Sequence, residues 1–178
     1  MNAIIFQKLD TDFLRKDALD NFNRYQIIKR CWRKQGEEWV LTDNPFIEDW
    51  DTDQKRNVVS ELTSCISNNG VVLGAICDNK IIGFASVSPA LFGKNSEYIE
   101  LPLIQVSAEY RHKGIGRKLF ELIADNARLL GAKKIYISAH SSEESQAFYR
   151  SVGCVDAVEI NKTIAENEPF DCQMEYVL

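Results

Sequence analysis

The sequence predicts a single α/β (α+β) domain with a mixed, mostly antiparallel central sheet of about seven strands flanked by helices. A length of 178 residues, of which 45% are hydrophobic, suits one core better than two. Strand-like alternation dominates after residue 70, and two amphipathic segments interrupt it. No internal repeat or low-complexity segment divides the chain. We therefore expect residues 1–178 to form one domain with the order β-α-α-β-β-β-α-β-α-β-β.

The first seventy residues read as one strand followed by a mostly helical region. Residues 3–9 alternate loosely, and residues 10–12 supply capping side chains for a helix that begins near Phe13. Four large side chains then recur at the spacing of a helical core stripe: Phe22, Tyr25, Ile28 and Trp32. A second helix is predicted over residues 52–67, and it ends at Asn68, Asn69 and Gly70, where a left-handed stop is favoured.

The middle of the chain changes to the period of strands. Residues 71–76 and 80–87 predict a hairpin, joined by a tight turn at Asp78 and Asn79. A loop is expected over residues 89–96. Residues 98–106 then form a strand in which Pro102 indicates irregular pairing or a bulge.

The last third alternates helices and strands. Residues 114–130 are amphipathic, and Gly131 is placed to end that helix. Residues 135–137 predict a short buried strand. Ser141 and Glu144 form a candidate capping box for a helix that Gly153 closes. Two strands, over residues 154–161 and 172–177, complete the fold.

Composition and charge limit the kinds of partner that the protein is expected to bind. The net charge of -5 gives no basic field that would attract nucleic acid or a membrane surface, so we expect neither partner. The five cysteines lack paired metal-binding spacings, His112 and His140 are isolated, and no metal is expected. The N-terminus lacks a basic leader followed by an apolar region, and no apolar run could span a bilayer. These features favour a cytoplasmic protein.

The segment from Arg111 to Lys118 carries the clearest chemical signal. A strand runs through this turn into a helix, which gathers unpaired backbone N–H groups where a phosphate can bind. The alternative is a simple glycine turn before a helix that happens to start with basic residues. Such residues oppose the helix dipole at a cost of about 0.3–1 kcal/mol each, which a bound anion would offset. A dinucleotide fingerprint would need a small residue at Leu119, and a P-loop would need Ser or Thr after Gly-Lys.

At Arg111, Gly114 and Gly116 the sequence resembles the cofactor signature Gln/Arg-x-x-Gly-x-Gly/Ala of the GNAT superfamily of N-acetyltransferases. Residues 142–154 are similar to a second family pattern, Asn-x-x-Ala-x-x-Phe-Tyr-x-x-x-Gly-Phe. Ser142 stands where that pattern has Asn. The resemblance is specific from residue 71 onward and rests on element order before it. It implies a GNAT-like domain and an acyltransferase that passes the acetyl group of acetyl-CoA to a primary amine.

The resemblance also implies site residues. Cofactor contacts would come from the following set: Ile104, Val106, Arg111, His112, Lys113, Gly114, Ile115, Gly116, Arg117, Lys118 and Ser142. The pyrophosphate would rest on the amides of residues 113–118. The strands around residues 103–106 and 135–138 would diverge around the pantetheine arm, and an amide near residues 104–106 would meet the oxyanion.

Two side chains are candidates for proton transfer. Tyr149 falls on the family's acid position, and a phenol with a pKa of about 10 keeps its proton at neutral pH. Its alternative role is core packing. Glu100 lies where some GNAT enzymes place a base, and its alternative is an exposed strand carboxylate.

The acceptor is left open among small polyamines, aminoglycosides, amino acids and peptides. Aromatic and acidic residues within residues 12–69 could shape a site for a cationic amine: Trp32, Glu37, Glu38, Trp39, Asp43, Asp49, Trp50, Asp51 and Asp53. A solvated acidic face with buried tryptophans is the other interpretation. Two other classes compete with an enzyme: a non-catalytic acyl-CoA-binding sensor or interaction module, and a phosphate- or nucleotide-binding domain. The protein would be a monomer or a homodimer.

Overall fold

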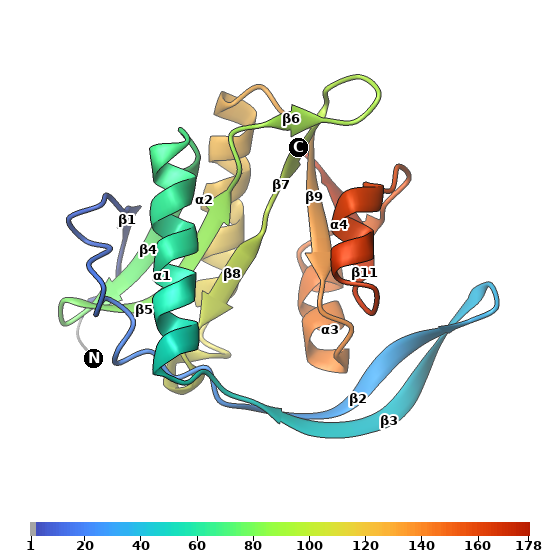
Figure 1. The fold of residues 1–178 in the computed structure, drawn as a ribbon, viewed down its shortest axis with the longest axis horizontal. Coiled ribbons are helices and arrows are strands. Elements are labelled where there is room, and N and C mark those ends of the chain that lie inside the picture. The colour runs from blue at the N-terminus through green and yellow to red at the C-terminus, as the bar shows by residue number, and fades with distance from the viewer. Residues whose placement is uncertain (1–2) are drawn as a thin grey trace.

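The computed structural model describes residues 3–178 as eleven strands, four α-helices and one 3-10 helix (Figure 1). The strands are β1 (Ile5–Lys8), β2 (Gln26–Gln35), β3 (Glu38–Glu48), β4 (Val71–Cys77), β5 (Lys80–Val87), β6 (Leu91–Phe92), β7 (Tyr98–Glu100), β8 (Leu103–Val106), β9 (Lys134–Ala139), β10 (Val155–Asp156) and β11 (Cys172–Val177). The helices are α1 (Thr52–Ser67), η1 (Ala108–Tyr110), α2 (Ile115–Leu129), α3 (Glu143–Ser151) and α4 (Lys162–Asn167).

Two sheets meet at one broken strand. The first has the order β1-β4-β5-β8, and the second has the order β10-β11-β9-β7-β6. The strand predicted over residues 98–106 divides at Pro102, which has no N–H to donate to a ladder. Before the break β7 pairs in parallel with β9, and after it β8 pairs with β5. If β7 and β8 are counted as one broken strand, the two sheets together form a mixed, mostly antiparallel sheet. Its other members are β1, β4, β5, β9, β10 and β11, and the short β6 lies at one edge. This arrangement confirms the predicted fold class.

Local signals account for the elements that the sequence predicted well. Asp78 and Asn79 both have positive φ, 51° and 58°, as the tight turn between β4 and β5 requires. Helix α1 has the predicted bounds. Asp51 and Gln54 cap it reciprocally, and Asn69 takes the expected left-handed conformation with φ 65°.

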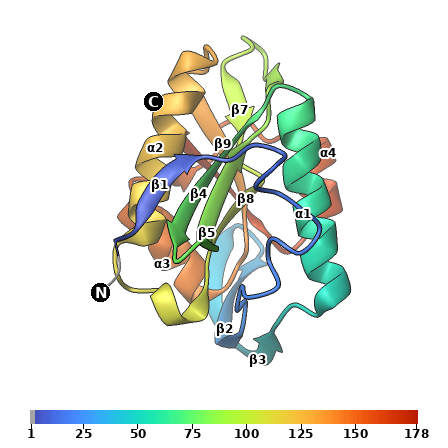
Figure 2. The same cartoon turned by 90° about the vertical axis from the view of Figure 1, so that its left-hand side faces the viewer.

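Helices cover both faces of the first sheet (Figure 2). On one face α2 buries Ile115, Leu119 and Ile123 against a core that the two sheets share. On the other face α1 buries Val59 and Leu62 with residues of β4 and β5. The two helices thus pack on both faces of the sheet that carries β5 and β8 beside the gap between the sheets.

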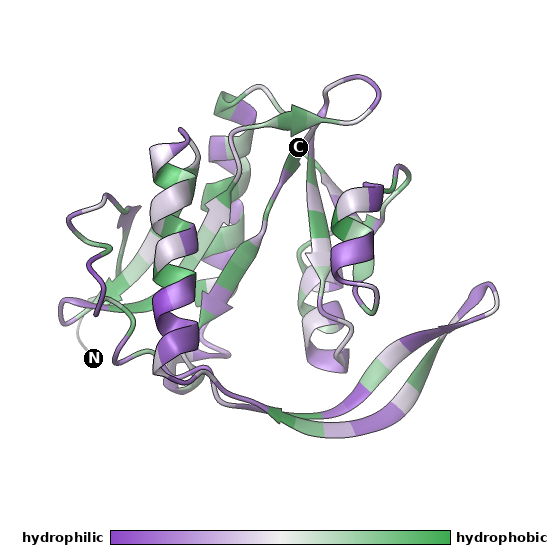
Figure 3. Ribbon diagram, in the orientation of Figure 1, coloured by the Kyte–Doolittle hydropathy of each residue, from purple (hydrophilic) through white to green (hydrophobic). Residues whose placement is uncertain are grey.

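The predicted helical region from residue 12 to 69 is wrong over most of its length. Residues 11–21 form turns, and β2 and β3 form a long hairpin that extends below the gap between the sheets (Figure 1). This hairpin alternates hydrophobic and hydrophilic segments, as expected for strands (Figure 3). The proposed stripe is therefore not a helix face: Ile28 is buried opposite Phe46, whereas Tyr25 is exposed.

Two C-terminal predictions also need correction. The strand expected over residues 154–161 is reduced to β10, and helix α4 follows, capped by the Asn161 side chain. The N-cap of α3 is Ser142 and not Ser141, because the Ser142 hydroxyl accepts the Ser145 N–H at 3.3 Å. The loop expected over residues 89–96 contains the short strand β6.

Candidate active site

One edge of β8 is open toward the gap between the sheets. The Ser107 N–H donates to the Ile82 carbonyl on β5 at 2.9 Å. Because amides alternate sides along a strand, the N–H groups of Ile104 and Val106 point away from β5. No other strand within residues 3–178 pairs with β8. These two amides therefore face the gap that β9 borders on its other side (Figure 1).

The turn that follows offers a row of free amides. Within the described chain, no residue accepts a hydrogen bond from the backbone N–H of any residue from 112 to 117. Gly114 is the N-cap of α2 and has no side chain to cap it, and the first turn of α2 has no acidic residue. Unpaired amides at a helix N-terminus form a seat for an anion. The Lys118 N–H does not belong to this seat, because it donates to the Gly114 carbonyl at 3.0 Å.

Backbone geometry explains the two glycines of the turn. Gly114 has φ 80°, a conformation that L side chains rarely adopt, and a Cβ there would meet no atom within 4 Å. Space for a ligand is thus open above this residue. At Gly116 a Cβ would lie 3.2 Å from the Phe148 ring, so that glycine permits α3 to pack against α2.

The basic side chains are largely engaged with the protein itself. The Arg111 guanidinium donates to the carbonyls of Val106, Tyr25 and Arg24 at 3.0, 2.9 and 3.0 Å. It therefore ties the end of β8 to the chain entering β2. Burial is the main cause that lowers the pKa of this guanidinium, yet an arginine stays charged at neutral pH. Three of its five N–H donors are thus committed to the protein, so this side chain holds two segments of the chain together in this arrangement.

Two further cations of the turn also have partners. Arg117 donates to the Ser151 carbonyl at 3.0 Å, at the C-terminal end of α3. Lys113 donates to the Glu109 carbonyl at 2.8 Å and lies over the Tyr110 ring. The backbone of the turn is thus better placed than its side chains to hold a phosphate.

Tyr149 lies on α3 with its ring against that of Phe148, at 5.3 Å between centroids. Burial is the main cause that raises the pKa of its phenol well above the usual value, with smaller contributions from Cys154 and Asp171. Within residues 3–178 its hydroxyl makes no hydrogen bond to a side chain or backbone group. This phenol therefore keeps its proton at neutral pH.

Ser142 is occupied inside its own helix. It is 0% exposed, and its hydroxyl donates to the Ser145 Oγ at 3.0 Å in addition to accepting the Ser145 N–H. The side chain expected to replace a cofactor-contacting Asn serves here as a helix cap.

Glu100 ends β7 and is half-buried, so it is not the fully exposed strand carboxylate of the alternative interpretation. Burial raises the pKa of its carboxyl group. Because side chains alternate along a strand, Glu100 shares a face with Tyr98, whereas Ile99 enters the core beneath α2. Its negative charge acts on the nearby Tyr136 phenol and raises the pKa of that group, although burial of the phenol raises it more.

The sequence analysis missed a polar row on β9 and β11. Tyr136 donates to Gln173 Oε1 at 2.7 Å, Gln173 donates to Ser138 Oγ at 3.0 Å, and Ser138 donates to Asp171 at 3.2 Å. Burial is the main cause that raises the pKa of Asp171. The alternation of Tyr136 and Ser138 with buried isoleucines was the available signal, but it did not show which polar groups of β11 would pair with it.

The aromatic and acidic residues proposed to hold an acceptor are not brought together. Trp32 and Trp39 pack against the main core, and Trp50 stacks on Phe22 at 5.8 Å. Asp51 caps α1. Glu37 and Glu38 lie at the distal turn of the β2–β3 hairpin (Figure 1).

Residues 3–178 contain neither a cluster of metal ligands nor a helix suited to a membrane. No three side chains of His, Cys, Asp or Glu in this range are grouped closely enough to hold a metal ion. None of the described helices has the length and apolar character needed to cross a membrane.

A sheet that splits beside a helix N-terminus with unpaired amides defines the class of protein as a coenzyme A-dependent acetyltransferase. The model of the acetyltransferase (GNAT) family matches residues 24–154, and the chain belongs to that family. Membership makes the protein an acyltransferase with acetyl-CoA as its co-substrate. A search of curated proteins found no match.

Solved structures share the fold at low sequence identity. Nourseothricin acetyltransferase superposes with a TM-score of 0.67 at 17% identity, over 98% of each chain. A putative streptothricin acetyltransferase from Bacillus anthracis str. Ames, solved with acetyl coenzyme A, gives 0.71 at 16% identity over 99% of each chain. The PaiA N-acetyltransferase from Thermoplasma acidophilum, solved with coenzyme A, gives 0.60 at 16% identity over 99% of each chain.

Proposed function

We propose that this protein transfers the acetyl group of acetyl-CoA to a primary amine by direct attack of the amine on the thioester. The observation that carries the proposal is the row of free amides from residue 112 to 117, directly beyond the open edge of β8. The amides would receive the pyrophosphate. The open edge would pair with the pantetheine arm as an added strand does, which would bring the thioester into the gap near Ile104 and Val106.

The open edge also has a catalytic use. When the amine nitrogen attacks the carbonyl carbon, negative charge develops on the carbonyl oxygen. An N–H of Ile104 or Val106 that is already fixed in the gap would stabilise this charge without rearrangement. This N–H donor belongs to the backbone of β8. Its position therefore depends on the break at Pro102, which separates β8 from β7.

Glu100 and Tyr149 complete the proton transfers. Glu100 accepts a proton from the attacking amine, directly or through water, and its raised pKa brings the carboxylate closer to the working pH. The C–S bond breaks as the tetrahedral intermediate collapses. Tyr149 then donates its phenolic proton to the departing thiolate, which leaves an amide and free coenzyme A.

The acceptor side should favour a cation. Glu100 acts on Tyr136, and hydrogen bonds through Gln173 and Ser138 connect Tyr136 to Asp171, so two carboxyl groups lie along this polar row. Glu48 adds little charge to it, because its carboxylate is ion-paired with Arg24. The acceptor would be a small-molecule or peptide amine. Residues 1–178 then act as one domain in which the β2–β3 hairpin and α1 shape the acceptor side. Cytoplasmic location and a monomeric or homodimeric state stay predictions.

The test follows free thiol release from acetyl-CoA across a library of primary amines. The neighbours named for nourseothricin and streptothricin make small molecules the first acceptors to screen. Tyr149→Phe should lower kcat by about 100- to 10,000-fold with little change in acetyl-CoA affinity, because general acid catalysis is removed. Tyr176→Phe, on β11, is the matched control and should leave kcat unchanged.

Two results would contradict this mechanism. Acetyl-CoA binding with no thiol release for any amine would support a non-catalytic sensor instead. Unchanged kcat in Tyr149→Phe would remove Tyr149 from the proton transfers.

A further inference from the structure

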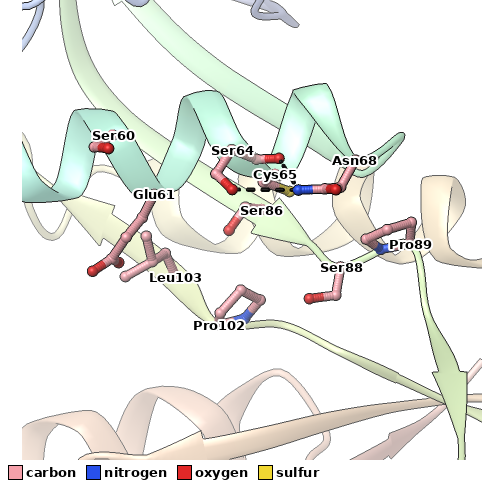
Figure 4. Close-up of a pocket in the computed structure, with 10 residues that line it drawn as sticks. All are labelled: Ser60, Glu61, Ser64, Cys65, Asn68, Ser86, Ser88, Pro89, Pro102 and Leu103. Carbon is pink, nitrogen blue, oxygen red and sulfur yellow. Dashed lines mark hydrogen bonds between the residues drawn. The ribbon is translucent and has the colours of Figure 1, made fainter.

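A pocket lies beside the break at Pro102. A pocket of about 500 Å³ opens between α1, the end of β5 and the start of β8 (Figure 4). It is lined by polar side chains of α1 on one side and by Ser86 and Ser88 on the other. Pro102 and Leu103 form the wall toward the gap between the sheets.

Ser86 lies at the buried end of this pocket without a partner. It is 1% exposed, and its hydroxyl is the one buried side-chain polar atom within residues 3–178 that makes no hydrogen bond. Figure 4 shows the hydroxyl directed toward the pocket and away from the helix backbone. A buried hydroxyl without a partner destabilises a fold, and alanine would avoid that cost. A serine at this position is explained if a ligand group supplies the missing hydrogen bond.

The polar lining is continuous on α1. Ser60, Ser64 and Asn68 follow one another at four-residue spacing and so share one face of the helix. The apolar residues of α1 that are buried, Val59 and Leu62 among them, lie on a different face. The row is therefore separate from the packing of α1 on the sheet.

Charge limits what the pocket can hold. Glu61 is the one charged side chain among the lining residues, so an anion would be repelled and a cation attracted. The hydroxyls of Ser60, Ser86 and Ser88 can each donate and accept a hydrogen bond. The Ser64 hydroxyl already accepts from the Asn68 amide at 3.3 Å and can still donate. This combination suits a ligand with several hydroxyl groups and an ammonium group.

The pocket also adjoins the proposed reaction point. The Ser88 N–H donates to the Glu100 carbonyl at 3.0 Å, so the pocket wall is fixed to the residue that carries the proposed base. Leu103 lines the pocket, and the next residue, Ile104, presents its amide to the gap. A ligand in the pocket could extend an amine past Pro102 to that point.

We propose that this pocket binds the hydroxyl-bearing part of the acceptor, and that the acceptor is a polyhydroxylated primary amine such as an amino sugar or an aminocyclitol. The proposal rests on the proposed acetyl transfer. It assigns Ser86 as a specificity-determining residue whose hydroxyl bonds a hydroxyl group of the acceptor.

The test compares amines with and without hydroxyl groups on the 178-residue protein. Thiol release is measured with D-glucosamine, 2-deoxystreptamine and cyclohexylamine, and kcat/KM for a hydroxylated amine should exceed that for cyclohexylamine at least tenfold. Ser86→Ala should reduce that ratio about 5- to 10-fold, the size of one hydrogen bond. Ser67→Ala, which removes a hydroxyl of α1 outside the pocket, is the matched control and should leave the ratio unchanged.

A stability measurement separates a ligand-binding role from a structural one. Because the Ser86 hydroxyl has no partner in the protein, Ser86→Ala should not lower the melting temperature. Equal kcat/KM for cyclohexylamine and both hydroxylated amines would overturn the inference, and so would a ratio that Ser86→Ala leaves unchanged. The proposed function fails separately, if no amine causes thiol release although acetyl-CoA binds.

Discussion

Replacing Arg111 by alanine separates a structural role for this side chain from direct phosphate binding. The guanidinium donates to three backbone carbonyls and joins the end of β8 to the chain entering β2. A hydrogen bond to a charged group contributes about 1.5–3 kcal/mol, but the three bonds share one side chain and one of them is exposed to solvent. We therefore expect a total loss of about 2–4 kcal/mol in the free energy of unfolding.

The assay is thermal and urea unfolding of Arg111→Ala beside Arg117→Ala. In a chain of this length about 1 kcal/mol corresponds to 2–4 °C, so Arg111→Ala should lower the melting temperature by roughly 4–16 °C. Arg117 donates at the exposed end of α3, and its variant should change stability by less than about 0.5 kcal/mol. Unaltered stability of Arg111→Ala together with lost acetyl-CoA binding would refute this reasoning, because it would show that Arg111 binds the phosphate directly.

Two further predictions concern the turn and the base. Gly114→Ala places a side chain at φ 80° above the free amides; it should destabilise the protein by about 1–2 kcal/mol and raise the KM for acetyl-CoA in steady-state assays. An unchanged KM would argue against the anion seat. Burial raises the pKa of Glu100, and a base must be ionised, so kcat/KM for the amine should fall as the pH drops through a value above the usual glutamate range. Protonation of the acceptor amine gives an acid limb of its own, so Glu100→Gln should remove only the limb that belongs to the carboxyl group. A Glu100→Gln profile with the same limbs as the unsubstituted protein would assign the base to another group.

The parts of the fold that could be predicted from the sequence depend on neighbouring residues. The turn at Asp78 and Asn79 and the cap at Asp51 are settled by side chains within a few positions of one another. The β2–β3 hairpin is different, because Ile28 pairs with Phe46 across eighteen positions, and the helical spacing of large side chains over residues 22–32 is a coincidence. Tertiary pairing overrides such a local pattern.

The same distinction holds for the candidate site. The free amides follow one another in the chain, so the contiguous glycine turn in the sequence is enough to indicate them. The commitment of Arg111 to carbonyls near residue 24 could not be predicted, because it depends on how distant segments meet. The unpartnered hydroxyl of Ser86 and the pairing of Ser138 with Asp171 depend on packing in the same way.

Backbone amides, and not the basic side chains, should supply most of the hold on acetyl-CoA if the proposed site is right. An amide NMR titration of the 15N-labelled protein with acetyl-CoA tests this directly. We predict that the largest shifts fall on Ile104, Val106 and residues 112–117, and that these amides become protected from hydrogen exchange as the site fills. Saturable binding that leaves these amides unshifted and unprotected would contradict the proposed site.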